Sequence, residues 1–399
     1  MSISKIRFSS LFGSLLIMGM PLWSSPSPDS IFTEVSNLVR SQFFNANFVR
    51  DSLPALEKEF RPQFSKASAM DVPLLMQKFL ARLGASHTEY LTPDDPAYYQ
   101  LAATFQMPGI TYPTIGLATG IQSGHLFVFS VFPGSPAEKA GILAGDEILS
   151  VDSKPFKPVA SLRVPSGKPI HLTYKRKAKA KPVTVKIIPE NINPLDEGLR
   201  AEKSSVRIET RRGHKIGYIH IYFYGGEQFQ NALEDALLWE SLKDAEAVVI
   251  DLRFGLGGAD PSYLRLFDKN IPILTSIDQK GTKNTYDSQW RKPVAYLVDR
   301  SSRSGKEILA YAAKKYKTAL VLGDTTAGRV LAGSLFSLSN GDRLYLAVMD
   351  TYVDGERIEG HGVAPDVYIP WDIRYCQGKD PRIEKAFDIL ADSLSREAR

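Results

Sequence analysis

Near the start of the chain, apolar residues recur at three- and four-residue steps. Residues 31–39 and 72–80 both show this spacing, which places their apolar side chains on one face of an α-helix. Gly84 follows the second run, and glycine is a common residue just past the end of a helix. The pattern therefore predicts a helical region over residues 30–84.

A different pattern begins near residue 108. Short runs rich in β-branched and aromatic residues, such as 125–131, 146–152 and 170–174, alternate with glycine and proline turns up to residue 190. This spacing predicts a small β-rich module. The lysine- and arginine-rich segment 175–181 stands between two of its expected strands. A solvated hairpin tip is the favoured interpretation, and a basic patch for acidic partners is the alternative.

From residue 206 onward, strand-like and helix-like segments alternate. The polar stretch 191–205, with Pro194 and Gly198, is interpreted as a linker before them. The expected strands are nearly continuous apolar runs at 216–223, 247–252, 293–298 and 318–323, with a helical run at 229–238 among the segments between them. Such runs predict an α/β layer with a buried, largely parallel sheet. Ligand sites in these sheets lie at the carboxyl ends of strands, which here are residues 251–258 and 299–304.

The composition narrows the class of protein. The chain has 399 residues, 43% of them hydrophobic, and a formal net charge of +5. These values exclude a disordered, collagen-like or disulfide-rich chain. Cys376 is the single cysteine, so cysteine-ligated zinc and iron–sulfur sites are excluded. The small positive net charge does not indicate a nucleic-acid-binding surface, which needs a clustered basic face. No phosphate-binding loop motif is present in the sequence. We expect no cofactor, no metal and no nucleic-acid partner.

The first 25 residues predict a secretory signal peptide. Lys5 and Arg7 precede a 13-residue apolar stretch at 11–23, and a polar exit rich in serine and proline follows. The stretch is shorter than the ~20 residues that span a bilayer. An uncleaved anchor or a buried helix is the alternative. We therefore expect an exported protein, periplasmic or extracellular, with no membrane span after cleavage.

Ser304 is the first candidate for chemistry. It lies on a turn of small residues between the strand that ends at Val298 and an apolar-periodic helix. A serine there is exposed at the sheet edge, and the helix N-terminus behind it favours an oxyanion. The alternative is structural, because serine is also a common helix N-cap.

A serine nucleophile needs a base, and the base needs an orienting group. Of the six histidines, His87 and His361 lie in loop-like contexts, whereas His125, His171 and His220 lie in strands and His214 in a polar loop. Glu359 is the candidate orienting acid. Gly257 and Gly258 follow a buried strand, where glycines allow close backbone approach to a ligand. A simple tight turn is the alternative there.

Together and in this order, these segments resemble the C-terminal processing peptidases, also called tail-specific proteases. The resemblance covers nearly everything after the signal peptide. It implies a helical region at 26–107, a PDZ domain at 108–190 and an α/β, ClpP/crotonase-like serine peptidase core at 191–399. The PDZ similarity rests on Ile115-Gly-Leu117, on 133–142 and on 145–152. It implies that Ile115, Gly116 and Leu117 form a loop that captures the C-terminal tail of a protein substrate.

In the core, the resemblance rests on five short motifs, which are 216–219, Asp251-Leu-Arg with Gly257-Gly258, Ser304 with 307–310, 323–328 and 358–366. It implies that Ser304 is the nucleophile. The oxyanion hole would then be the N–H of Gly305 with that of Gly257 or Gly258.

One departure from the family pattern concerns the base. Many members use a lysine 25 residues after the serine, and here position 304 + 25 = 329 is Arg329. A guanidinium keeps its proton, so Arg329 is no general base. The altered context also places Lys306 two residues after Ser304, at a helix start where it would point elsewhere.

The related tricorn core protease and the chlamydial secreted protease use Ser, His and Glu instead. By this resemblance His87 is the base and Glu359 orients it through Ser86. Lysine-dyad members often carry a similar histidine without using it for catalysis.

Two main hypotheses for the function therefore stand, and a pure scaffold protein is a third, less economical one. One is an endopeptidase that forms an acyl-enzyme at Ser304. The other is an inactive pseudopeptidase that binds C-terminal tails, with Arg329 paired to Glu307 or Glu359. The substrate and the oligomeric state are left open.

Overall fold

The computed structural model describes residues 26–397. The expected signal peptide, residues 1–25, lies outside the described residues. Within the described part, no helix combines the length and the apolar character needed to cross a membrane.

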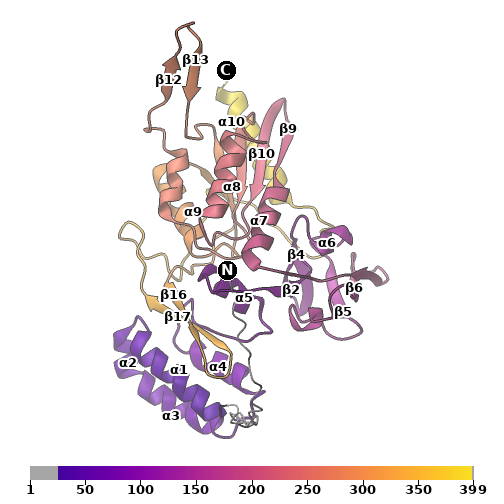
Figure 1. The fold of residues 1–399 in the computed structure, drawn as a ribbon, viewed down its shortest axis with the longest axis vertical. Coiled ribbons are helices and arrows are strands. Elements are labelled where there is room, and N and C mark those ends of the chain that lie inside the picture. The colour runs from indigo at the N-terminus through magenta and orange to yellow at the C-terminus, as the bar shows by residue number, and fades with distance from the viewer. Residues whose placement is uncertain (1–25, 398–399) are drawn as a thin grey trace, which may run out of the picture.

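The N-terminal helices form a lobe with its own hydrophobic core at one end of the molecule (Figure 1). The lobe consists of α1 (Pro28–Gln42), α2 (Ala46–Asp51), α3 (Leu53–Phe64) and α4 (Val72–Ala81). Its core includes Phe32, which stacks on Phe64 with ring centroids 4.4 Å apart. As the apolar spacing predicts, helices occupy most of residues 30–84, and Gly84 has a φ of 62° beyond the last of them.

Strands from the C-terminal part of the chain complete this lobe. β16 (Ala332–Ser337) and β17 (Arg343–Met349) form an antiparallel pair, and Leu344 and Leu346 of β17 belong to the helical core. β1 (Glu89–Leu91) joins β17 as a third antiparallel strand. This pairing brings the segment just before β1, which contains Ser86 and His87, against the C-terminal part of the chain.

The β-rich module is a five-stranded antiparallel sheet with its own apolar core. Its strand order is β3 (Leu117–Gln122), β4 (His125–Val131), β5 (Glu147–Val151), β6 (Ile170–Lys175) and β7 (Val183–Ile187). The order makes β3 an edge strand. The module also holds α6 (Pro136–Lys139) and the 3₁₀ turn η1 (Ala160–Leu162), and β2 (Tyr112–Thr114) pairs with β8 (Glu190–Ile192) beside it. The basic segment 175–181 connects β6 to β7, as expected for a hairpin tip.

The largest unit is a six-stranded sheet covered on both faces. Its order is β18 (Val367–Tyr368), β15 (Leu320–Gly323), β14 (Val294–Val298), β11 (Ala247–Asp251), β10 (His214–His220) and β9 (Arg207–Arg211). Every neighbouring pair is parallel except β9 with β10. The predicted parallel sheet is therefore confirmed. It places Ser304 and the Gly257–Gly258 turn just beyond the carboxyl ends of β14 and β11.

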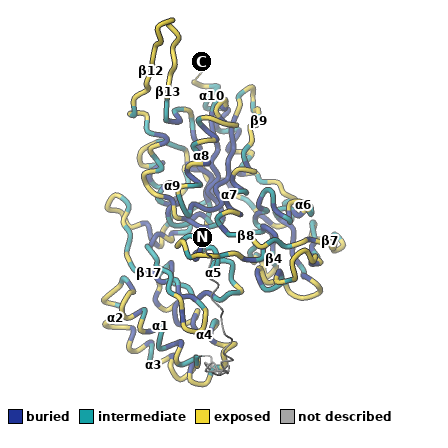
Figure 2. Tube along the Cα trace, in the orientation of Figure 1, coloured by how far each residue is buried: buried dark blue, intermediate teal, exposed yellow. Residues whose placement is uncertain are grey.

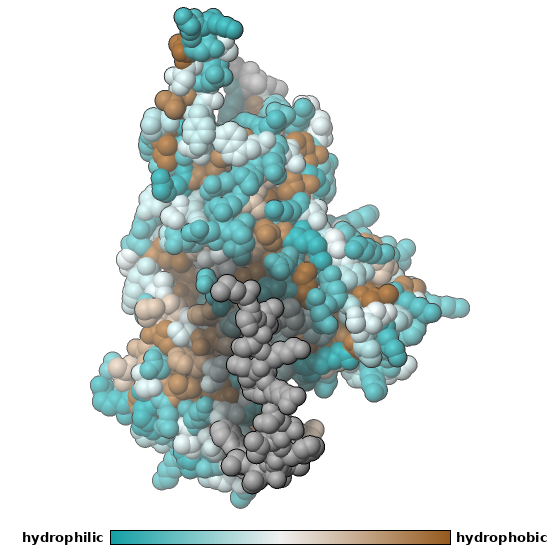
Figure 3. Space-filling view, in the orientation of Figure 1, coloured by the Kyte–Doolittle hydropathy of each residue, from teal (hydrophilic) through white to brown (hydrophobic). Residues whose placement is uncertain are grey.

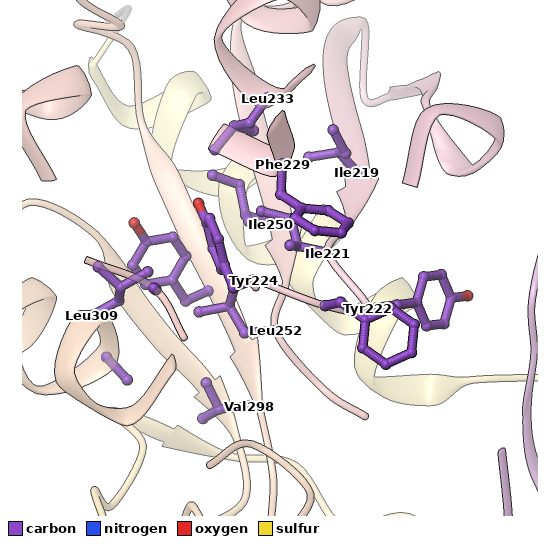
Figure 4. Close-up of a cluster of buried hydrophobic side chains, with 14 of the residues drawn as sticks. Ile219, Ile221, Tyr222, Tyr224, Phe229, Leu233, Ile250, Leu252, Val298 and Leu309 are labelled. Carbon is purple, nitrogen blue, oxygen red and sulfur yellow. The ribbon is translucent and has the colours of Figure 1, made fainter. Parts of the chain in front are cut away.

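Helices bury the two faces of this sheet. α8 (Glu227–Leu238) and α9 (Gly305–Tyr316) cover one face, where Phe229, Leu233 and Leu309 meet Ile250 and Val298 (Figure 4). α10 (Pro381–Glu397) covers the other face through Ala386, Phe387 and Leu390. The near-continuous apolar character of the strands follows from this burial on both sides.

The linker expected at 191–205 is wrong. Asn193 caps a helix, α7 (Pro194–Ser205), and its side chain accepts a hydrogen bond from the N–H of Leu195. The buried face of α7 includes the carboxylates Glu197 and Glu202, so it reads as polar in the sequence. The signal that could have found this helix is Asn193 followed by Pro194, a cap and a first-turn proline.

α5 (Pro96–Thr104) follows β1 and lies within the helical region expected at 26–107. The 3₁₀ helix η2 (Pro261–Phe267), which was not predicted, precedes a long hairpin. That hairpin, β12 (Leu274–Ile277) with β13 (Lys283–Tyr286), projects from the unit built on the six-stranded sheet (Figure 1). Both strands are exposed along their length (Figure 2). Leu274 and Ile277 are 61% and 62% exposed, and apolar surface is visible on the projection in Figure 3.

Candidate active site

Ser304 sits at the sharp turn between β14 and α9. It is the N-cap residue of α9, with φ 58° and ψ −130°. An N-cap residue ordinarily has extended backbone, and a positive φ at a non-glycine residue costs ~1–3 kcal/mol. The N–H of Ser304 donates to the carbonyl of Arg329 at 2.8 Å, which helps to hold this conformation. Strained turns of this kind between a strand and a helix present serine nucleophiles in other folds.

Glu307 fixes the position of this turn. Its buried carboxylate accepts hydrogen bonds from the Thr326 hydroxyl at 2.6 Å and from the N–H groups of Gly328 and Arg329 at 2.7 and 2.8 Å. It also accepts from the N–H of Ser304 at 3.1 Å. Burial raises the pKa of Glu307, and the four donors oppose that shift. Glu307 thus ties the segment before β16 to the serine turn.

His87 is connected to Glu359 through Ser86. The Ser86 hydroxyl donates to Glu359 Oε2 at 3.0 Å. Ser86 Oγ also lies 2.9 Å from His87 Nδ1. The N–H of Ser86 also donates to Glu359 Oε1 at 3.2 Å. Val330 adds a third hydrogen bond to the Glu359 carboxylate, because its N–H donates to Oε2 at 2.7 Å. These bonds fix the carboxylate and, with it, the histidine ring.

The hydrogen-bond chain also selects the histidine tautomer. A hydroxyl has one proton to donate, and an ionised carboxylate only accepts. With the Ser86 proton directed to Glu359, Ser86 Oγ accepts from His87 Nδ1–H. The lone pair of the neutral ring is then on Nε2, which is the atom a general base uses.

The surroundings of His87 favour its neutral form. Burial lowers the pKa of His87 to about 4, aided by Arg303 and Arg329 and opposed by Glu359. At neutral pH the ring is therefore uncharged and able to accept a proton. The ring also packs near Tyr345, with centroids 5.3 Å apart.

His87 and Ser304 line the same cavity, which has a volume of about 240 Å³. Gly257, Gly258 and Arg329 also line it. Its remaining wall is largely apolar and includes Leu101, Phe105, Leu256, Leu331 and Tyr345. Four sequence candidates for nucleophile, base and oxyanion binding thus meet at one cavity, although they come from segments far apart in the chain.

Glycine is required at two positions around the serine. A Cβ at Gly257 would lie 2.6 Å from the Cβ of Ser304, and a Cβ at Gly305 would lie 2.4 Å from the nitrogen of Ala259. Among the hydrogen bonds of residues 26–397, the N–H groups of Gly257, Gly258 and Gly305 have no acceptor within the protein. The close approach leaves backbone donors around the serine, as an oxyanion hole needs.

Arg329 and Lys306 occupy different environments. The Arg329 side chain is 53% exposed, and its closest ionic partner is Glu89, with Nη1 and Oε1 3.8 Å apart. The pairing expected with Glu307 or Glu359 is wrong, because both carboxylates are occupied by backbone N–H donors. Lys306 points away from the cavity, and its Nζ donates to the carbonyls of Ile221, Tyr222 and Phe254 at 2.8, 2.9 and 2.6 Å.

Comparison with known proteins fits this architecture. The sequence model of peptidase family S41 matches residues 215–369, and that of the PDZ domain matches residues 113–187. The core of this chain, residues 215–369, therefore resembles peptidase family S41 in sequence. Members of this family are serine-type peptidases, so both the fold class and the family resemblance inferred from the sequence are confirmed.

Relatives of this chain carry names that describe C-terminal processing. Carboxyl-terminal-processing peptidase 2, chloroplastic, of Arabidopsis thaliana is 26% identical over 391 residues, which cover 92% of this chain and 72% of that protein. The carboxyl-terminal-processing protease of Synechocystis is 24% identical over an alignment 420 positions long, gaps included, which covers 98% of this chain and 93% of that protein.

Two solved structures are similar to this chain in fold. The photosystem II D1 C-terminal processing protease superposes with a TM-score of 0.52 at 22% identity, covering 89% of this chain and 98% of that one. The tricorn protease superposes with a TM-score of 0.60 at 19% identity, covering 92% of this chain and 37% of that one.

The predicted tail-binding loop of the PDZ domain is hydrogen-bonded internally in this structure. The N–H of Gly116 donates to Thr114 Oγ1 at 2.9 Å, and the carbonyl of Ile115 accepts from Ala137 at 2.9 Å. Leu117 begins the edge strand β3. A Cβ at Gly116 would lie 2.2 Å from that of Ser135, so this loop accepts only glycine there.

Sequence reasoning missed a buried carboxylate beneath this loop. Glu197 of α7 accepts from the hydroxyls of Tyr112 and Thr114, and Thr114 in turn supports Gly116. Burial raises the pKa of Glu197 to about 7. The place of Arg303 beside the site and the role of Glu307 in holding the serine turn were also missed. Glu307 stands three residues after Ser304, the spacing of a capping box, and that signal could have found it.

The other histidines lie outside the Ser304 cavity. His125, His171 and His214 each contact a carboxylate, from Glu147, Asp152 and Glu246 respectively. His220 is buried, and its Nε2 lies 2.9 Å from the carbonyl oxygen of Arg253. Within residues 26–397, no group of three histidine, cysteine or acidic side chains is arranged to hold a metal ion.

Proposed function

We propose that this serine-type peptidase is an exported endopeptidase that cleaves protein substrates near their C-termini, through an acyl-enzyme at Ser304. The observation that carries the proposal is the chain from Glu359 through Ser86 to His87, with His87 and Ser304 on one cavity. A base that is neutral, oriented and on the same cavity as the nucleophile would make a lysine at position 329 unnecessary.

In the proposed mechanism, His87 Nε2 accepts the hydroxyl proton as Ser304 Oγ attacks the scissile carbonyl. Negative charge on the carbonyl oxygen is met by the N–H of Gly305 and that of Gly257 or Gly258. His87 then returns the proton to the departing amine, which leaves an acyl group on Ser304. Water, deprotonated by the same histidine, hydrolyses this ester. Glu359, acting through Ser86, orients the ring and stabilises the imidazolium.

The wall of the cavity supports a preference at the cleavage site. Leu101, Phe105 and Leu331 provide apolar surface beside Ser304. Burying an apolar side chain there is favourable by ~25 cal/mol per Å² removed from water. We therefore propose an apolar residue on the amino-terminal side of the cleaved bond.

A fluorophosphonate probe tests the nucleophile directly. The chain without residues 1–25 is incubated with the probe beside its Ser304→Ala and His87→Ala variants. Labelling that needs both residues is expected. Labelling that survives His87→Ala but not Ser304→Ala would contradict His87 as base. Hydrolysis of a protein substrate that Ser304→Ala abolishes would complete the case.

A second candidate function is tail binding without cleavage, and Arg329 at the usual lysine position is the observation that favours it. This pseudopeptidase would bind C-terminal peptides through its PDZ domain but neither label with the probe nor cleave. The same experiment separates the two, because the folded wild-type protein either reacts at Ser304 or does not.

Export is proposed from residues 1–25 alone. Their basic start, apolar stretch and small-residue exit are typical of a cleaved signal. The N-terminal sequence of the protein recovered from the producing cells tests this. A start between residues 24 and 28 is expected, and a start at Met1 would overturn the proposal.

A further inference from the structure

A second, larger cavity separates the PDZ domain from the serine turn. Its volume is about 670 Å³. Ala118 and Thr119 of the edge strand β3 line one side, and Arg300, Arg303 and Arg329 of the peptidase core line the other. Arg303 and Arg329 also line the smaller cavity that holds Ser304, so the two cavities meet at these two side chains.

The charge of this cavity is one-sided. Three arginines line it, together with the exposed His361, and no aspartate or glutamate is among its lining residues. In the described part of the chain, the guanidinium groups of Arg300 and Arg303 form no ion pair or hydrogen bond. Burial and the neighbouring charge of Arg329 both lower the pKa of Arg303, while Glu89 opposes that shift. Arg329 has a carboxylate partner in Glu89, with Nη1 and Oε1 3.8 Å apart. The other two guanidinium groups are free to bind an incoming anion, and the neighbouring positive charges favour it.

The position of the cavity relates it to the path of a substrate. β3 is the edge of the PDZ sheet, and PDZ domains bind a peptide by adding it as a strand to such an edge. A chain held at its C-terminal end by β3 and cleaved at Ser304 must cross the space between them. The segment that crosses is the one between the scissile bond and the C-terminal end.

We propose that the arginine-lined cavity binds carboxylates of this crossing segment, so that the enzyme selects substrates with acidic residues just after the cleavage site. The proposal rests on the proposed function and adds the chemistry of its substrate. It also gives Arg329 a role. A guanidinium cannot act as a base, but its planar donors match a carboxylate in a bidentate pair, which lysine does not offer.

The test is a binding measurement on the chain without residues 1–25 that carries Ser304→Ala, so that the peptide is not cleaved. Two fluorescent peptides share one sequence with a free C-terminus. One carries two glutamates after the apolar residue at the cleavage position, and the other carries glutamines there. We expect the acidic peptide to bind at least about tenfold more tightly, with a difference that falls as salt is raised. Equal affinities would overturn the proposal.

Variants assign the difference to the cavity. Arg300→Gln and Arg303→Gln, each in the Ser304→Ala background, should lower the affinity for the acidic peptide and leave that for the glutamine peptide unchanged. The matched control is Lys177→Gln, on the basic hairpin tip between β6 and β7, which should change neither affinity. If Lys177→Gln alone removes the preference, the hairpin tip and not the cavity recognises the acidic segment.

A third peptide distinguishes two sources of carboxylate. It keeps the glutamines but has an amidated C-terminus. If the arginines bind the terminal carboxylate instead of side chains, only amidation will weaken binding in an arginine-dependent way, and the proposal fails in its present form. Failure of the proposed function shows elsewhere, as absence of probe labelling in the wild-type protein, so the two results are independent.

Discussion

Ser86 and Glu359, which are 273 residues apart in the sequence, are joined by a hydroxyl-to-carboxylate hydrogen bond of 3.0 Å. Two strand pairings make this contact possible. β1, which follows Ser86, pairs with β17, and β17 pairs with β16 after the Arg329 segment. The lobe that looks like a separate helical domain therefore supplies the base of the proposed site, and the peptidase sheet supplies the nucleophile.

The first prediction concerns this bond. Glu359→Gln leaves the side chain the same size but adds two donors that compete with the Ser86 and Val330 contacts. The change should release the preferred tautomer of His87 and lower kcat/KM by about a hundredfold or more, as loss of the orienting acid does in other triads. Steady-state hydrolysis measures it. Glu356→Gln, exposed on the same loop, is the control and should match wild type.

The second prediction is a pH profile. His87 must be neutral to accept a proton, and its pKa is lowered to about 4 by burial, Arg303 and Arg329. The acidic limb of kcat/KM should therefore lie near pH 4, well below the ordinary histidine value of about 6.5. Glu359 is the carboxylate that opposes the shift.

Arg303→Gln removes one of the causes of this shift. The pKa of His87 should rise, so the variant should lose activity at a higher pH than wild type as the pH falls. A neutral substrate is used, so that substrate charge does not enter. Arg300→Gln is the comparison, because Arg300 lies outside the Ser304 cavity and should leave the limb in place. Identical limbs in all three proteins would show that Arg303 does not act on His87.

Much of the fold could be predicted because burial on both faces leaves long apolar runs in the strands. The site could be predicted only partly. The spacing of motifs indicated Ser304, and the resemblance indicated His87, Ser86 and Glu359, but no pattern specifies that β1 pairs with β17. The helix α7 was missed because its buried face carries the charged residues Glu197 and Glu202. The segment therefore reads as polar throughout and shows no apolar helical spacing. The direction of the Arg303 side chain depends on tertiary packing alone.

The third prediction addresses the residue at the usual lysine position. Arg329→Lys supplies an amine at the position where the resemblance to the C-terminal processing peptidases implies a lysine. The native side chain is 53% exposed there, so burial would do little to remove the charge of a lysine at pH 7. The double variant Arg329→Lys with His87→Ala should therefore remain unlabelled by a fluorophosphonate probe. Recovery to a tenth of the wild-type labelling rate would show that position 329 still suits a base.

The fourth prediction tests the contact between the glycine turn and the nucleophile. Gly257→Ala introduces a Cβ that would lie 2.6 Å from both the Ser304 Cβ and the carbonyl oxygen of Arg303. The new methyl group must displace the serine turn, because these neighbours are backbone or directly attached to it. Probe labelling should fall by at least about a hundredfold, the scale of losing an oxyanion donor.

The companion measurement is thermal unfolding, since the same clash also strains the folded state. Gly257→Ala should lower the melting temperature, yet the protein should remain folded at the assay temperature, so the loss of labelling reflects geometry. Gly281→Asn is the matched control. Gly281 has a φ of 83° with open space around it, and asparagine tolerates that backbone region. Normal labelling by Gly257→Ala would mean that the glycine turn does not form the oxyanion hole.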